Sequence, residues 1–130
     1  MRLWHESLLP YLPRQQLLGQ HRECCALRGK GWGKPHATVN YVFRHPLEWL
    51  WAYHIKVMGE MLRRGYTPDP KWLDPGYRGT SHELEKNLPG FDSGLRRAFP
   101  DTMVYPEHDD KYLWECIENL KRKGAEIHFG

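Results

Sequence analysis

The stretch from Pro46 to Gly65 limits the possible folds of this chain more than any other, because its apolar residues recur at helical spacing. Two arginines and then Gly65 close the stretch, as is usual where a helix ends. The sequence therefore predicts a long helix that begins at Pro46 and ends before Gly65. The recurring positions are Leu47, Leu50, Trp51, His54, Ile55, Met58, Met61 and Leu62.

Two further segments have helical character. One runs from about Pro13 to Arg28 and is followed by Gly29. The other runs from about Asp109 to Lys123, with acidic residues at its start and basic residues at its end, as the helix dipole favours. We expect both to be helices. The side chains expected to be buried in the last helix are Leu113, Cys116, Ile117 and Leu120.

The region from Thr67 to Pro106 contains six prolines and four glycines, so we expect loops and short helices there. Turns of helix are expected at His82 to Leu88 and at Asp92 to Phe99, and a short helix or turn at residues 37–44. No segment has the alternating pattern of a strand. The prediction is an all-α fold: a single compact domain, residues 1–130, of three main helices with a long loop-rich segment before the last helix.

Positive charge is concentrated near the start of the chain. The whole sequence has 19 basic and 16 acidic residues, a formal charge of +3. Residues 1–36 hold six basic residues against two acidic ones, Glu6 and Glu23. Such a local excess fits contact with a phosphate backbone, but a solvated surface with acidic neighbours has the same composition. The six basic residues are Arg2, Arg14, Arg22, Arg28, Lys30 and Lys34.

Cysteine and histidine usage argues against a disulfide framework and against a metal site. The three cysteines include a vicinal pair, Cys24 and Cys25, but no CxxC motif, and we expect the pair to be small buried hydrophobes rather than nucleophiles. The eight histidines are scattered without an HExxH motif, and His54 is expected to be a hydrogen-bonded structural residue. The sequence thus predicts no metal and no cofactor.

The first residues do not have the pattern of a signal peptide, because Arg2, His5 and Glu6 interrupt any apolar run. No stretch approaches the ~18 apolar residues that a membrane span needs. Together with the cysteine usage, this leads us to expect a reduced, cytoplasmic protein with no membrane contact, and the sequence implies no obligate protein partner.

Two ordered motifs resemble those of a known family. Residues 15–23 read Q-Q-L-L-G-Q-H-R-E, and residues 47–66 contain L-E-W-L, then Ile55, Glu60 and Leu62, and finally R-R-G-Y. They resemble the Q-H-L-x-A-E-Y-R-E and L-E-F-L…I…E…L-K-R-G-F motifs of the phage endonuclease V (pyrimidine-dimer DNA glycosylase) family. The opening M-R-L is similar to that family's nucleophile-Arg-Ile start. The resemblance covers about the first half of the chain.

This resemblance implies a DNA repair glycosylase with abasic-site lyase activity on damaged DNA, with pyrimidine dimers as substrate. The family's N-terminal amine forms a Schiff base with the sugar, which implies Met1 as nucleophile and Glu23 as catalytic carboxylate. Double-stranded DNA, damaged or abasic, is the implied partner, and a nucleoid-associated location follows. The residues implied to bind DNA are Arg2, Gln15, Gln16, Arg22, Arg28, Lys30 and Lys34.

An α-amine suits this role for a physical reason. Its reference pKa of about 7.7–8.0 lies roughly 2.5 units below that of lysine, so a larger share is unprotonated at neutral pH. The charge of the neighbouring Arg2 favours the unprotonated amine further. We expect Met1 to be retained, because methionine aminopeptidases spare methionine before a residue as large as arginine.

Because of two departures from the family pattern, substrates other than pyrimidine dimers must be considered. Gln16 stands where the family has histidine, and the family's aromatic, basic C-terminal segment is absent. A glycosylase for a different modified base is therefore an alternative, as are a non-catalytic nucleic-acid-binding module and a protein-interaction domain. The aromatic residues considered for wedging or stacking against DNA are Trp32, Trp72, Tyr77 and Phe129.

Overall fold

Helices form where the apolar periodicity and the end signals predict them. The computed structural model describes residues 2–125, and its three main helices closely match the predicted ranges. A shorter helix and three 3₁₀ helices lie between and before them. No strand occurs within residues 2–125, so the predicted all-α class is confirmed. The α-helices are α1 (Arg14–Arg28), α2 (Leu47–Arg63), α3 (Phe91–Arg97) and α4 (Asp110–Arg122), and the 3₁₀ helices are η1 (Glu6–Tyr11), η2 (Asn40–Arg44) and η3 (Pro70–Leu73).

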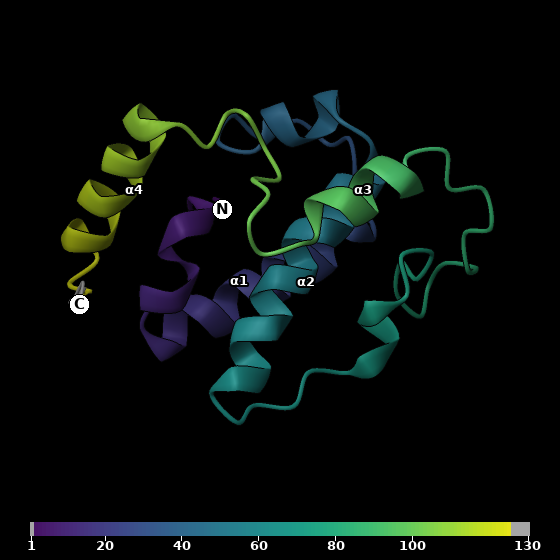
Figure 1. Cartoon of the computed structure of the whole chain (residues 1–130), viewed down its shortest axis with the longest axis horizontal. Helices are drawn as coiled ribbons and strands as arrows, with labels where there is room; N and C mark the ends of the chain where they lie inside the picture. Colours follow the sequence, from purple (N-terminus) through teal and green to yellow (C-terminus); the bar gives the residue numbers. More distant parts are fainter. Residues whose placement is uncertain (1, 126–130) are drawn as a thin grey trace.

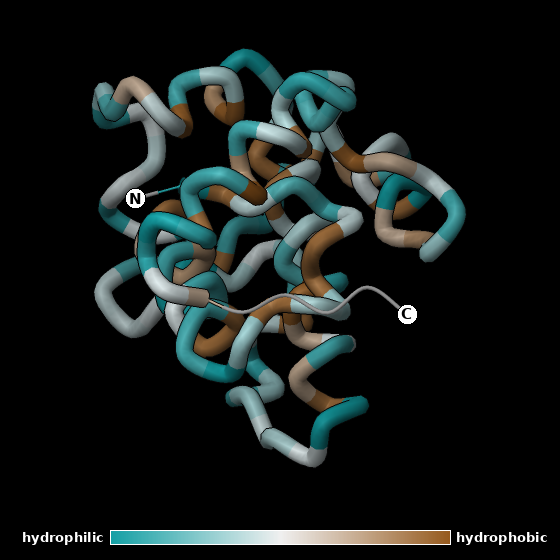
Figure 2. The backbone as a smooth tube through the Cα atoms, turned by 90° about the vertical axis from the view of Figure 1, so that its left-hand side faces the viewer, coloured by the Kyte–Doolittle hydropathy of each residue, from teal (hydrophilic) through white to brown (hydrophobic). Residues whose placement is uncertain are grey.

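α2 is the central helix of the fold. Residues 50–54 are all buried, so neighbours cover α2 on every side at this level. It packs against α1, α3 and η1, and it crosses in front of α1 in Figure 1. Elsewhere the backbone alternates between hydrophobic and hydrophilic residues, as expected for helices with one solvated face (Figure 2). Within the described residues, none of the helices combines the length and hydrophobicity that spanning a bilayer requires.

α4 is fixed by a cap and by one buried face. The Asp109 side chain accepts a hydrogen bond from the Tyr112 N–H at 2.8 Å, which satisfies a donor in the first turn. Cys116, Ile117 and Leu120 are buried, as the sequence predicts. The opposite face of α4 is exposed to solvent.

The N-terminal segment, residues 2–5, runs between α4 on one side and the α1–α2 pair on the other (Figure 1). Leu3 and Trp4 are buried there. The segment continues into η1, which the sequence does not predict because the element is only six residues long and contains Pro10. This path brings the start of the chain alongside α1.

The expected helical turn from His82 to Leu88 is wrong. The Glu85 N–H instead donates a hydrogen bond to the Gly76 carbonyl at 2.8 Å. The two sides of this loop approach so closely that a Cβ on Gly76 would lie 2.2 Å from the Glu85 carbonyl oxygen. Pro89 also disfavours helical geometry at the residue before it. A backbone contact across the loop has therefore taken the place of a helical turn.

Replacing Gly94 with alanine is expected to destabilise the fold by about 1–3 kcal/mol, because α3 packs too closely on α2 to accept a side chain there. A Cβ on Gly94 would lie 2.7 Å from the backbone oxygen of Glu48. Gly59→Ala in α2 is the matched control, since no atom lies within 4 Å of its added Cβ. Thermal unfolding followed by circular dichroism should show a lower Tm for Gly94→Ala alone. Equal Tm values would contradict this close packing.

Candidate active site

Glu23 lies in the second half of α1 and meets the first residues of the chain. The Arg2 backbone N–H donates a hydrogen bond to Glu23 Oε2 at 3.4 Å. The carboxylate is half-buried. The sequence predicts both residues as members of one site, and the structure brings them together. Met1, the predicted nucleophile, lies outside the described residues.

Gln20 holds this arrangement in place, one helical turn before Glu23. Its side chain is 1% exposed. Gln20 Nε2 donates to the Arg2 carbonyl at 3.0 Å and to Glu23 Oε2 at 3.2 Å. Gln20 Oε1 accepts from the Trp4 N–H at 2.6 Å and lies 2.8 Å from the Tyr53 hydroxyl. One buried amide therefore ties the N-terminal segment, Glu23 and α2 to one another.

Hydroxyl groups from two other helices complete the support of the N-terminal segment. The Tyr53 hydroxyl of α2 lies 2.6 Å from the Trp4 carbonyl oxygen. The Tyr112 hydroxyl of α4 donates to the Leu3 carbonyl. Because three helices hold this short segment, residues 2–5 are fixed beside Glu23.

A small cavity opens between α1, α4 and the N-terminal segment, with Glu23 in its wall. Its volume is about 210 Å³. That is about seven times the share of one water molecule in the liquid, which is room for a small polar group. Two cations, Arg2 and Lys123, line it together with Glu23, which is the carboxylate among its described lining residues. The remaining lining residues are Trp4, Thr38 and Asn119.

Arg2 lies where this cavity meets a second, larger hollow on the solvent face of α4. Its guanidinium carbon is 5.6 Å from the centre of the Tyr112 ring, a distance at which a cation is attracted to an aromatic face. Arg2 and Asn119 line both the cavity and the larger hollow. The positive charge of Arg2 is thus available to a ligand in either place.

The polar residues predicted on α1 divide between two faces of the helix. Gln15 and Arg22 are exposed and line a shallow hollow of about 330 Å³ together with Arg14. Successive residues in an α-helix point about 100° apart, so this hollow adjoins the face that carries Glu23 without sharing it. Gln16 is half-buried and does not line the hollow.

Lys30 and Lys34 are exposed but belong to a different hollow, of about 640 Å³, at the far end of α1. Cys25 also lines that hollow. By helical periodicity Cys25 points about 160° away from Glu23. The two lysines are therefore not brought together with the Glu23 cavity.

Arg28 requires a correction, because the sequence analysis places it among the residues that contact DNA. It is 1% exposed, and the four N–H groups on its two terminal guanidinium nitrogens donate hydrogen bonds inside the protein. They donate to the carbonyls of Trp72, Asp74 and Tyr77 at 2.7, 2.8 and 3.0 Å, and to His54 Nδ1 at 2.9 Å. Burial lowers the pKa of Arg28 to about 10, so the group stays charged at neutral pH. Arg28 is a structural residue that cannot reach a phosphate.

His21, Cys25 and His54 gather within 4.8 Å of one another, a grouping that the sequence analysis does not anticipate. Cys24 is buried as predicted, but Cys25 is only half-buried and faces the two rings. Burial lowers the pKa of both histidines, so their rings are neutral. Burial also raises the pKa of the Cys25 thiol to about 11, which keeps it protonated and poorly nucleophilic.

The contact with Arg28 determines which ring nitrogens of this cluster carry protons. A guanidinium only donates hydrogen bonds, so His54 Nδ1 must accept and the ring proton of His54 lies on Nε2. That proton points to His21 Nδ1 at 2.8 Å, and His21 Nε2 then faces the Cys25 sulfur at 3.8 Å. A protonated Nε2 has no lone pair for a metal. The geometry favours a hydrogen-bond chain, and the structural role predicted for His54 is confirmed.

Sequence reasoning missed several residues that build the cavity. Gln20 lies three residues before Glu23, so helical spacing alone places it on the same face, and this was the available signal. Asn119 and Lys123 are also one turn apart, but on α4. Nothing local indicates that α4 packs against the N-terminal segment, so these two could not be found from spacing.

Comparison with known proteins gives one match. A family model described as pyrimidine dimer DNA glycosylase matches residues 1–74, which is more than half of the chain. The matched part contains the N-terminal segment, α1 with Glu23, and α2, and it ends before α3 and α4. No curated protein and no solved structure matches the chain.

Proposed function

The chain belongs to the pyrimidine dimer DNA glycosylase family, and we propose that it acts on damaged DNA as a glycosylase with abasic-site lyase activity, using the amine of Met1 as nucleophile and Glu23 as catalytic carboxylate. The observation that carries this proposal is the hydrogen bond from the Arg2 N–H to Glu23 at 3.4 Å. Bond lengths keep the α-nitrogen of any residue within about 4 Å of the next backbone nitrogen. This covalent limit supports the proposal that an amine on Met1 acts together with the Glu23 carboxylate.

The proposed reaction begins with the unprotonated amine attacking C1′ of the damaged nucleotide. The glycosidic bond breaks, and the base leaves with the electron pair and gains a proton. Opening of the sugar ring then gives a protonated imine between the amine and C1′. Removal of a proton from C2′ expels the 3′ phosphate, which nicks the strand. Hydrolysis of the imine finally releases the amine.

Glu23 takes part in two steps of the proposed reaction. Its negative charge stabilises the positive charge that develops on the sugar as the base leaves, an effect that is strong in a half-buried cavity. It also lies close enough to the N-terminal segment to move protons during imine formation and elimination. Lys123 and Arg2 in the same cavity attract phosphate oxygens.

Exposed and half-buried polar residues of α1 supply the next part of the proposed DNA surface. Arg22 contacts a phosphate, and Gln15 and Gln16 donate hydrogen bonds to the same strand. Lys30 and Lys34 add sequence-independent attraction farther along the duplex. This attraction is expected to weaken as salt is raised. Pyrimidine dimers are the proposed substrate, and a different modified base is the alternative.

Trapping with borohydride tests the proposed function. Incubation with a duplex that contains one abasic site, in the presence of sodium borohydride, is expected to give a covalent adduct of the chain with the cleaved strand. Mass spectrometry of the digested adduct should locate it on the α-amine of Met1, and chemical acetylation of that amine should abolish it. An adduct on Lys123, the other amine of the cavity, would overturn the assignment of the nucleophile. Salt-sensitive binding without any adduct would instead support a non-catalytic module.

A further inference from the structure

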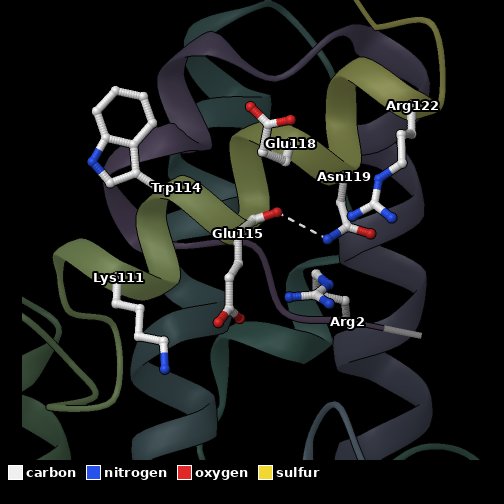
Figure 3. Close-up of a pocket in the computed structure, with 7 residues that line it drawn as sticks. All are labelled: Arg2, Lys111, Trp114, Glu115, Glu118, Asn119 and Arg122. Atoms are coloured by element: carbon white, nitrogen blue, oxygen red, sulfur yellow. Dashed lines mark hydrogen bonds between the residues drawn. The ribbon is translucent and has the colours of Figure 1, made fainter.

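We propose that the solvent face of α4 is a base-stacking subsite, in which Trp114 packs against a nucleobase of the DNA strand whose sugar occupies the Glu23 cavity. The inference rests on the proposed function for the identity of its ligand. The subsite is the larger hollow already described, of about 610 Å³, formed by Arg2 and the outer side chains of α4 (Figure 3). We call it the α4 hollow.

Trp114 is the most exposed large hydrophobic side chain among the described residues, at 63%. It forms no hydrogen bond or ring contact with any residue from 2 to 125. In Figure 3 the indole projects from α4 at one end of the α4 hollow. A bare indole offers a flat face on which any base can stack, and such contacts are tolerant of sequence.

The charges around Trp114 suit a nucleic acid strand. Arg2, Lys111 and Arg122 line the α4 hollow, against two carboxylates, Glu115 and Glu118. Glu118 also lies 3.7 Å from the ammonium group of Lys121, which offsets part of its charge. The net charge of the side chains that line the α4 hollow is positive, so phosphates on either side of a stacked base lie near cations.

The α4 hollow adjoins the Glu23 cavity. Arg2 and Asn119 form part of the wall of both. Asn119 is held in position by its own side-chain donation to the Glu115 carbonyl at 2.8 Å, the dashed line in Figure 3. A strand that places one sugar beside Glu23 therefore has an adjoining nucleotide within reach of the outer face of α4.

The aromatic residues proposed from sequence are less suited to this role. The Trp32 ring packs edge-on against Phe43, with ring centres 5.1 Å apart. Trp72 and Tyr77 pack against each other at 4.7 Å and line the hollow on the far side of α1. Phe129 lies outside the described residues. Trp114 is the described aromatic that is both bare and adjacent to the Glu23 cavity.

Fluorescence anisotropy with a labelled duplex tests this subsite, using a tetrahydrofuran abasic analogue that cannot be cleaved. Trp114→Ala is expected to raise Kd by about fivefold or more, as for the loss of one base-stacking contact. Trp114→Phe should recover most of the affinity because it keeps a flat ring. Phe99→Ala, which removes a 58% exposed aromatic that follows α3, is the matched control and should leave Kd unchanged. Unchanged Tm values verify that each variant is folded.

The outcomes separate the subsite from the proposed function. If the unsubstituted chain gives the borohydride adduct but Trp114→Ala binds within twofold of it, the subsite is overturned and the lyase stands. If no adduct forms but Trp114→Ala still weakens binding while Phe99→Ala does not, the subsite stands as a DNA contact and the lyase is overturned. Equal losses for Trp114→Ala and Trp114→Phe would also overturn stacking, since only the indole N–H and ring size differ.

Discussion

Glu23→Gln is expected to lower the rate of strand cleavage at an abasic site by about 10²- to 10⁴-fold, the usual contribution of a positioned proton-transfer group. The amide keeps the shape of the side chain and one acceptor oxygen. That oxygen can still accept the Arg2 N–H and the Gln20 side chain, so the N-terminal segment is expected to stay in place. What the substitution removes is the negative charge and the ability to take up a proton.

Single-turnover cleavage of a labelled abasic duplex measures this effect, and binding of the uncleavable analogue measures affinity separately. The rate should fall while Kd changes little, because the role assigned to Glu23 belongs to the chemical steps. Glu83→Gln is the matched control, since Glu83 is an exposed carboxylate in the loop before α3. Cleavage within tenfold of the unsubstituted rate would remove Glu23 from the mechanism, even if the adduct on Met1 still formed.

The main helices could be predicted from sequence because local signals determine them. Apolar spacing and the residues at each end of α2 are sufficient to place it, and the same holds for α1 and α4. η1 was missed because a six-residue 3₁₀ helix has too little periodicity to detect. The turn expected near His82 failed because a long-range backbone bond from Glu85 to Gly76 outweighed a weak local preference.

The candidate site was predictable only where its residues lie close in sequence or match a family motif. Glu23 and Arg2 were found in this way, and they do meet. Lys123 lies a hundred positions from Glu23 in sequence and enters the cavity only because α4 packs on the N-terminal segment. Trp114 was not predicted as a site residue for a different reason. The helical spacing assigns Leu113, Cys116, Ile117 and Leu120 to the buried face, but it does not show how exposed Trp114 is or which hollow it lines.

Arg28 shows a different limit of prediction from sequence. Counting basic residues does not reveal which of them are buried and therefore unable to contact DNA. The hydrogen bonds from its guanidinium give a stability prediction. Arg28→Met is expected to destabilise the fold by about 3 kcal/mol or more, since it removes a buried cation that donates to three backbone carbonyls and to His54. Methionine fills similar space but donates no hydrogen bond.

Urea unfolding measures this loss, with Arg22→Met as the matched control. Both substitutions remove an arginine from α1, but Arg22 is exposed, so its loss should change the free energy of unfolding by no more than about 0.5 kcal/mol. Hydrogen exchange adds a local readout: amides near residues 72–77 should exchange faster in Arg28→Met, because that segment is held to α1 through Arg28. Equal stabilities for the two variants would mean that water replaces the guanidinium at little cost, and that α1 and the segment at 72–77 are joined chiefly by their other contacts.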